Sequence, residues 1–348
     1  MSMTPKQVYV ETVKGGNPDR RSVAMLDGGA WQCQSVGKSL HDVLASPDAG
    51  AALSIKSAAD WGSDIVWTNM AGFGPFMEAM GCEVDFTKVG QAGTILKPAI
   101  DSIDEVGKLP QDAAAIREMA LANTHVTQVL KQLEGIHELN EGHRAVGLLM
   151  TGPFTFAGQL MNMDAFIKGV IRKPKEYADY IEWATMAQQV WGDLLIEHGG
   201  GDTVLIADPL ASGDVVSPRV YENLAKPTMG SLIAHLKQQA PEMLVMVHMC
   251  GHSTMRLAAH KEIGVDVFSF DKNDFAESIE IVDGDYAFFG NVPPSEILLN
   301  GSVEDVTNES KRILGAFADY SKFVLGTGCD LAPSTPLENI KAMSGSVL

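Results

Sequence analysis

The chain has 348 residues, 45% of them hydrophobic and 20% charged, which is an ordinary globular composition. Lys and Arg number 26 and Asp and Glu 44, so the net charge of −18 argues against binding to nucleic acid or to an anionic membrane surface. No apolar run approaches the roughly 20 residues of a membrane helix, and the N-terminus lacks a signal-peptide pattern, so we expect a cytoplasmic protein.

Short apolar runs rich in β-formers alternate with longer amphipathic stretches. Several of the short runs are apolar without alternation, which is typical of parallel strands buried on both faces. We expect eight strands: Val23–Leu26, Ile65–Asn69, Val146–Thr151, Val204–Ala207, Leu244–Val247, Val267–Phe270, Ala287–Gly290 and Phe323–Gly326. The stretch 72–96 is less regular and Gly-rich, and we expect an insertion there that contains a hairpin.

Helix start and stop signals fill the stretches between these runs. Ser302 with Asp305, and Thr335 with Glu338, have the spacing of a capping box and predict two helix starts. Pro227 predicts a break or a kink in the helix that follows Ser217-Pro218. Strand and helix therefore alternate eight times, which predicts an α/β protein with a closed (β/α)8 (TIM) barrel. We expect residues 1–348 to form one domain, because no linker divides them.

Polar residues follow the later strands, and barrel active sites lie at the carboxyl ends of strands. In chain order, these residues are Asp208, His248, Cys250, Asp271, Asn291 and Cys329. His248 and Cys250 are two apart, so in an extended segment both side chains share one face. Cys329 follows the eighth strand and meets them only if the barrel closes.

Imidazole with two thiolates is a ligand set that zinc prefers, and three protein ligands leave one position open for chemistry. The sequence thus predicts a zinc site made of His248, Cys250 and Cys329. The alternative is that each is an ordinary core residue, because buried cysteines commonly act as small hydrophobes. Cys33 and Cys82 lack partners in the sequence pattern, and we expect them to be structural. We expect His252 to be a polar loop residue.

Several segments together resemble the uroporphyrinogen decarboxylase superfamily, and within it the methylcobamide:coenzyme M methyltransferases. The resemblance covers most of the chain. The segments that carry it are Thr151–Thr155, Ala207–Ser212, Ser217-Pro218, His248–Gly251, Gly290–Val292, Gly326–Pro333 and Thr335–Asn339. The His-x-Cys followed by a distant Cys is similar to the zinc motif of the methyltransferase branch.

The resemblance implies roles for six residues. It implies a (β/α)8 barrel with zinc held by His248, Cys250 and Cys329, and Asp271 as a further, displaceable ligand. An ordinary polar strand end is the alternative for Asp271. Asp208 and Asn291 lie in segments shared by the superfamily, and we expect them to line the substrate pocket. The decarboxylase branch needs an arginine-rich motif near its N-terminus, and the corresponding Leu26–Gln32 has no arginine.

The function that the resemblance implies is zinc-dependent methyl transfer. The methyl group moves between a methylcorrinoid, carried by a small corrinoid protein, and a small acceptor such as the thiol coenzyme M. Zinc deprotonates such a thiol at neutral pH and makes it a nucleophile. The alternatives are an O- or N-methylated donor, a tetrahydrofolate-type acceptor, a decarboxylase-like enzyme, or a non-catalytic tetrapyrrole binder without zinc.

Overall fold

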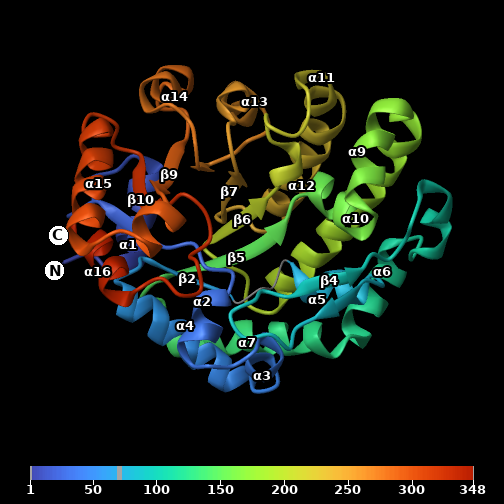
Figure 1. Cartoon of the computed structure of the whole chain (residues 1–348), viewed down its shortest axis with the longest axis horizontal. Coiled ribbons are helices and arrows are strands. Elements are labelled where there is room, and N and C mark those ends of the chain that lie inside the picture. The colour runs from blue at the N-terminus through green and yellow to red at the C-terminus, as the bar shows by residue number, and fades with distance from the viewer. Residues whose placement is uncertain (1, 69–72, 348) are drawn as a thin grey trace.

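The computed structural model describes residues 2–68 and 73–347 and contains an eight-stranded parallel sheet that is rolled into a nearly closed barrel (Figure 1). Its strands are β1 (Ser22–Ala24), β2 (Ile65–Trp67), β5 (Ala145–Thr151), β6 (Thr203–Ala207), β7 (Leu244–Met249), β8 (Val267–Phe270), β9 (Ala287–Val292) and β10 (Phe323–Thr327). All eight expected strands are confirmed. The predicted second strand was expected to end at Asn69, and the predicted insertion to begin at Gly72. Both residues lie outside the described part of the chain.

The uninterrupted apolar runs form strands that are buried along their whole length. Side chains that point inward fill the barrel, and those that point outward pack against the helices. The inward set includes Leu149, Leu205 and Phe289. Helix α1 (Pro5–Lys14) adds Tyr9 to this set, and the Tyr9 hydroxyl lies 3.0 Å from Thr203 Oγ1 at the start of β6. Helix α1 therefore closes the amino-terminal end of the barrel.

Among the residues that the structure describes, one seam of the barrel has no strand ladder. The hydrogen-bonded order runs from β1 through β10, β9, β8, β7, β6 and β5 to β2, so β1 and β2 end the row. The fully buried Asp64 bridges them: its N–H donates to Val23 O at 2.8 Å. Its carboxylate accepts from Val23 N and Ser22 Oγ and pairs with Arg20 at 2.5 Å. A charged network thus replaces the missing ladder.

Helices surround the strands, with α13 and α14 on one side of the barrel and α3, α4 and α7 on the opposite side (Figure 1). The remaining α-helices are α2 (Ala30–Ser35), α3 (Leu40–Leu44), α4 (Pro47–Trp61), α5 (Gly74–Ala79), α6 (Ala113–Ala122), α7 (Thr124–Asn140), α8 (Pro153–Leu160), α9 (Met163–Arg172), α10 (Pro174–Glu197), α11 (Pro218–Val220), α12 (Lys226–Gln239), α13 (Leu257–Glu262), α14 (Phe275–Val282), α15 (Val303–Ala316) and α16 (Leu337–Gly345). Short 3-10 helices are η1 (Ile103–Lys108), η2 (Pro209–Ala211) and η4 (Thr254–Arg256), and π turns are η3 (Tyr221–Ala225) and η5 (Pro294–Leu299). None of the described helices is both long and apolar enough to cross a membrane.

The helix signals are confirmed at two of three places. Ser302 and Asp305 form a reciprocal capping box on α15. A π turn precedes α12, which carries Pro227 in its first turn, so the helical hydrogen bonding changes there as predicted. The cap at Thr335 is wrong, because α16 begins at Leu337 with Pro336 in the N-cap position and Thr335 is buried.

The Gly-rich insertion contains the expected hairpin, preceded by the short helix α5. Strands β3 (Glu83–Asp85) and β4 (Thr94–Lys97) pair in antiparallel fashion. The ring of Phe86 explains two of the glycines. A Cβ at Gly74 or Gly93 would lie 2.3 or 2.9 Å from that ring, and Gly93 also has a φ of +102°. In Figure 1 the hairpin and α5 lie beside α6, at the edge of the barrel.

Candidate metal centre

Three donor atoms meet at the carboxyl ends of β7 and β10. His248 is the penultimate residue of β7, Cys250 follows that strand, and Cys329 lies two residues beyond β10. The distance from His248 Nε2 to Cys250 Sγ is 3.3 Å, and that from Cys250 Sγ to Cys329 Sγ is 3.7 Å. Within residues 2–68 and 73–347, this is the one compact group of three or more potential ligands. The structure therefore brings together the residues that the sequence nominated.

The spacing of the donors fits zinc. Two thiolates bound at about 2.3 Å in a tetrahedron would lie about 3.8 Å apart, close to the separation observed here. A disulfide would need about 2.0 Å, and both cysteines are free. His248 is buried, whereas Cys250 and Cys329 are each partly exposed. A borderline-soft cation with an open fourth position suits this set of donors.

A side chain on the neighbouring strand β8 orients the ring of His248. Ser269 on β8 is its register partner, and the Ser269 hydroxyl lies 3.0 Å from Nδ1. In the tautomer with a proton on Nδ1, the ring donates to Ser269 Oγ and leaves the Nε2 lone pair directed at the thiols. Metal-binding histidines are commonly held in this way, which fixes both ring angle and tautomer.

The thiols of Cys250 and Cys329 share one hydrogen bond, which shifts their pKa values in opposite directions. This bond lowers the pKa of Cys250 and raises that of Cys329, to which burial adds a further increase. Burial lowers the pKa of His248, but its hydrogen bond with Cys329 and the nearby negative charges outweigh burial and leave that pKa raised. The thiolate is the form of a cysteine that binds a metal.

Asp271 lies beside the cluster, directly after β8. Its Oδ2 accepts a hydrogen bond from Gly251 N at 3.2 Å, which ties it to the loop that carries Cys250. In the structure as described, its carboxylate does not join the three donors that lie within 4.8 Å of one another. Asn291, in β9, donates from Nδ2 to the Asp271 carbonyl at 2.8 Å. The roles of Asp271 as a displaceable ligand and of Asn291 in a substrate pocket stay predictions.

Asp208 follows β6 and is fully buried. Its Oδ1 accepts hydrogen bonds from Thr155 N at 2.7 Å and from Thr155 Oγ1 at 2.5 Å, at the start of α8. Burial raises the pKa of Asp208 to about 6. A Cβ at Gly152 would lie 2.4 Å from the Asp208 side chain, which explains the glycine in that segment. Asp208 thus joins two loops of the barrel mouth, and contact with a substrate stays a prediction.

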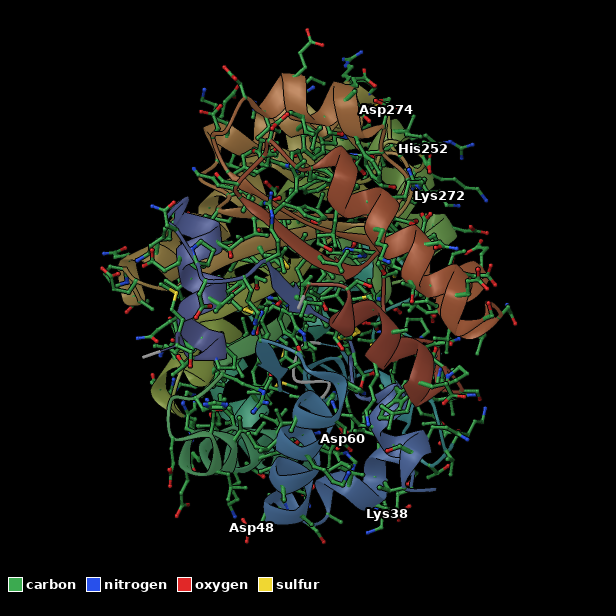
Figure 2. The ribbon with its side chains drawn as sticks, turned by 90° about the vertical axis from the view of Figure 1, so that its left-hand side faces the viewer. Lys38, Asp48, Asp60, His252, Lys272 and Asp274 are labelled. Atoms are coloured by element: carbon green, nitrogen blue, oxygen red, sulfur yellow. The ribbon has the colours of Figure 1, made fainter. Side chains whose placement is uncertain are left out.

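The remaining nominated side chains lie away from the cluster. His252 is exposed and pairs with Asp214 at 3.4 Å; Figure 2 shows it with Lys272 and Asp274 at one end of the molecule. Cys33 and Cys82 are buried, and burial raises the pKa of their thiols to about 12 and about 11. Such thiols are unreactive, in line with the structural role expected for them.

Two acids near the cluster were missed by the sequence reasoning. Asp330 follows Cys329, is exposed and lines a cleft, and the protein that surrounds its carboxyl group raises its pKa. Asp27 follows β1 and is fully buried. Burial, with the nearby charge of Asp330, raises the pKa of Asp27 to about 7. The only signal for Asp330 was its place in the segment Gly328-Cys329-Asp330, and Asp27 gave none.

The cleft that Asp330 lines has a volume of about 610 Å³. It lies between α5, the hairpin β3–β4 and the connection from α8 to α9, all of which follow the carboxyl ends of strands. Most of its lining is apolar and includes Phe73, Met77, Val84, Ile95, Met161 and Met163. The barrel mouth therefore offers a donor cluster and a separate, mostly apolar cleft that is lined by Asp330, the chain neighbour of Cys329.

Comparisons with known proteins agree with this geometry. The family model for uroporphyrinogen decarboxylase (URO-D) matches residues 4–347. The methylcobamide:CoM methyltransferase MtaA of Methanosarcina barkeri is 28% identical over 269 residues, which is 76% of this chain and 74% of that protein. A methylated-thiol–coenzyme M methyltransferase of Methanosarcina mazei is 26% identical over 273 residues, which is 76% of this chain and 67% of that protein. A solved methyltransferase structure from Methanosarcina mazei superposes with a TM-score of 0.86 at 24% identity, covers 99% of this chain and 98% of its own, and establishes the same fold.

Proposed function

Because the chain belongs to the uroporphyrinogen decarboxylase family, we propose that it is a zinc-dependent methyltransferase of that family. In this proposal it moves a methyl group between a methylcorrinoid, carried by a separate small protein, and a small thiol. The observation that carries the proposal is the cluster of His248, Cys250 and Cys329, whose two cysteines are partly exposed. Relatives that are named as methyltransferases support an enzyme of this class.

The residues of the cluster have distinct tasks in this reaction. When bound, zinc would supply the positive charge that keeps an acceptor thiol deprotonated at neutral pH. Ser269 holds the His248 ring so that Nε2 faces the two cysteines. Asp271 fixes the loop that carries Cys250 through the Gly251 amide, and we propose that its carboxylate can also fill the open ligand position until the acceptor arrives. Asp208 and Asn291 are proposed to shape the pocket from the ends of β6 and β9, which β7 and β8 separate.

The decarboxylase reaction of the family fits this chain less well. A porphyrinogen carries several carboxylates, which need cations as partners. The segment Leu26–Gln32 contains no arginine, and in the described part of the chain no Lys or Arg lines the cleft beside the cluster. Free thiols at the cluster fit a reducing compartment, and we propose that the whole barrel acts as one cytoplasmic domain.

The test is a methyl-transfer assay on the full chain. Zinc is first measured in the purified protein, and about one equivalent is expected. The protein is then mixed with methylcobalamin and small thiols, and loss of the methylcorrinoid is followed by absorbance. Transfer should need both thiol and zinc and should stop after treatment with a chelator. If no thiol accepts the methyl group but a tetrahydrofolate or a methylated donor supports transfer, the zinc site serves another substrate.

A further inference from the structure

The loop that carries Cys250 is held by side chains from the two neighbouring loops. Cys250 directly follows β7, so the strand fixes its backbone on the amino-terminal side alone. On the other side, the amides of Gly251, His252 and Ser253 each donate a hydrogen bond to a different side chain. The three acceptors come from the loops after β6 and β8, the strands that flank β7 in the sheet. The place of the Cys250 thiol therefore depends on contacts outside its own strand.

Asp214 is the acceptor that the loop after β6 supplies, between η2 and α11. Its Oδ2 accepts a hydrogen bond from the His252 amide at 3.0 Å. A Cβ at Gly251 would lie 2.2 Å from the same oxygen, and a Cβ at Gly213 would lie 2.6 Å from the His252 carbonyl. Gly251 also has a φ of +75°, which favours glycine. The two loops are thus packed closely, and the glycines make room for the contact with Asp214.

Asn273 supplies the matching contact from the loop after β8. Its Oδ1 accepts a hydrogen bond from Ser253 N at 2.8 Å. Both residues are buried, so water does not compete for this bond. Asp271, two residues earlier, accepts the amide of Gly251. With Asp214 on the other side, the loop is held at three successive peptide groups.

The contact between Asp214 and His252 depends on the backbone amide more than on the ion pair. The His252 ring lies 3.4 Å from Asp214 Oδ2, and the side chains are 65% and 52% exposed. Ion pairs between such exposed groups contribute little and are screened by salt. The hydrogen bond from the amide to the carboxylate is charge-assisted and restrains the backbone directly. An amide oxygen in the same place could still accept it.

We propose that Asp214 and Asn273 are positioning residues of the metal centre. By accepting two amides of the loop, they hold Cys250 where its thiol meets the other two donors. Neither residue belongs to the donor cluster itself, so each acts through the backbone. A ligand that is in place before the metal arrives loses less freedom on binding, which makes metal binding tighter. The inference rests on the proposed function, because it concerns the metal site which that function requires.

The first experiment changes the acceptor at Asp214 in two ways on the full chain. Asp214→Ala removes the acceptor, whereas Asp214→Asn keeps an oxygen that can accept the amide and removes the charge. Zinc affinity is measured by competition with a chelator. We expect about a tenfold loss of affinity for Asp214→Ala and less than about a threefold loss for Asp214→Asn. His252→Gln is the matched control: it keeps the backbone amide, loses only the ring, and should change the affinity less than about twofold.

A second measurement reports on the geometry of the site and not on folding. Cobalt(II), bound in place of zinc, has absorption bands that depend on the arrangement of its ligands. These bands should shift for Asp214→Ala and for Asn273→Ala, and stay unchanged for Asp214→Asn. A contact that only stabilises the fold would lower the melting temperature and leave the bands as they are. Because Asp214 is exposed, Asp214→Ala tests the inference even where the buried substitution Asn273→Ala prevents folding.

The outcomes separate this inference from the proposed function. Unchanged zinc affinity and cobalt bands in Asp214→Ala overturn the positioning role. A loss in Asp214→Asn as large as that in Asp214→Ala also overturns it, because the charge would then matter and not the accepted amide. Failure of the unmodified protein to bind zinc or cobalt contradicts the proposed function and removes the basis of the inference. Metal binding that weakens as expected, without any loss of methyl from methylcobalamin, supports the inference and contradicts the proposed function alone.

Discussion

The two halves of the barrel mouth are built on different physical principles. The half formed by the loops after β7, β8 and β10 is polar and compact. Cys250 Sγ lies 3.3 Å from His248 Nε2 and 3.7 Å from Cys329 Sγ. The half formed by the insertion after β2 and by the α8–α9 connection is an apolar cleft of about 610 Å³. Strand register positions the first half, and packing of a Gly-rich insertion around Phe86 shapes the second. The two halves can therefore vary independently within one fold.

The largest expected effect comes from the donor cluster. Cys250→Ala removes one of three ligands, so tight zinc binding should be lost and methyl transfer should fall by about 10³-fold or more. The barrel should stay folded, because the cysteine lies at the mouth and is only half-buried. Metal analysis and the methylcobalamin assay measure the effect. Cys82→Ala is the matched control and should keep its zinc; a Cys250→Ala variant that keeps one equivalent would contradict the ligand role.

The buried His260, in the helix that connects β7 to β8, predicts that the stability of the protein depends on pH. His260 is fully buried in α13, and burial, with Arg256 nearby, lowers its pKa to about 3. In the unfolded chain the imidazole of His260 is protonated below about pH 6.5, whereas in the folded protein it stays neutral until about pH 3. The contribution of the neutral His260 to the free energy of unfolding is therefore fully present above pH 6.5 and is lost as the pH falls towards 3. His260→Leu should remove this loss. Between pH 6.5 and 4.5, the variant should therefore gain roughly 2 kcal/mol relative to the unmodified protein.

Chemical denaturation at several pH values measures that difference. His143 is exposed, and His143→Leu serves as the control whose pH profile should follow that of the unmodified protein. Parallel profiles for His260→Leu and the unmodified protein would show that His260 titrates normally in the folded state.

A smaller effect is expected from the residue that orients His248. Ser269→Ala removes the hydroxyl that lies 3.0 Å from Nδ1 and frees the ring to rotate. Zinc affinity, measured by competition with a chelator, should fall by about tenfold while the stoichiometry stays at one. An unchanged affinity would mean that packing alone holds the ring.

The smallest effect tests whether the two halves are independent. Met77 lines the cleft and is 1% exposed. Met77→Ala should cost about 2 kcal/mol of stability, because it removes a buried apolar side chain. Zinc content should be unchanged, and loss of zinc in this variant would show that the halves are coupled.

The sequence predicted the polar half of the mouth much better than the apolar half. All eight strands could be located because burial on both faces leaves uninterrupted apolar runs. Parallel strands in a barrel then place Cys329 near His248 and Cys250 without any further information. The cleft depends on how the insertion packs, and nothing in its local pattern shows that Asp330 would line one cleft with Met77 and Met161.

Thr335 shows why one local prediction was wrong. Its capping-box spacing to Glu338 is correct, but the Thr335 carbonyl accepts a hydrogen bond from Trp31 Nε1 at 2.8 Å. This contact, across 304 residues of sequence, holds the segment inside the protein. Helix α16 then begins two residues later, at Leu337. A tertiary contact thus overrode a local preference, and no pattern around Thr335 reveals it.

The seam between β1 and β2 has a consequence for the order of events during protein synthesis. The ladder partner of β1 is β10, and Ser22 pairs in register with Val324. In the described barrel, β1 therefore gains a neighbour on a ladder only after β10 has been synthesised. Because Cys329 lies just beyond β10, the same late event brings the third donor to His248 and Cys250. We expect a nascent chain to acquire zinc tightly only when its barrel is complete, so metal uptake marks the end of folding.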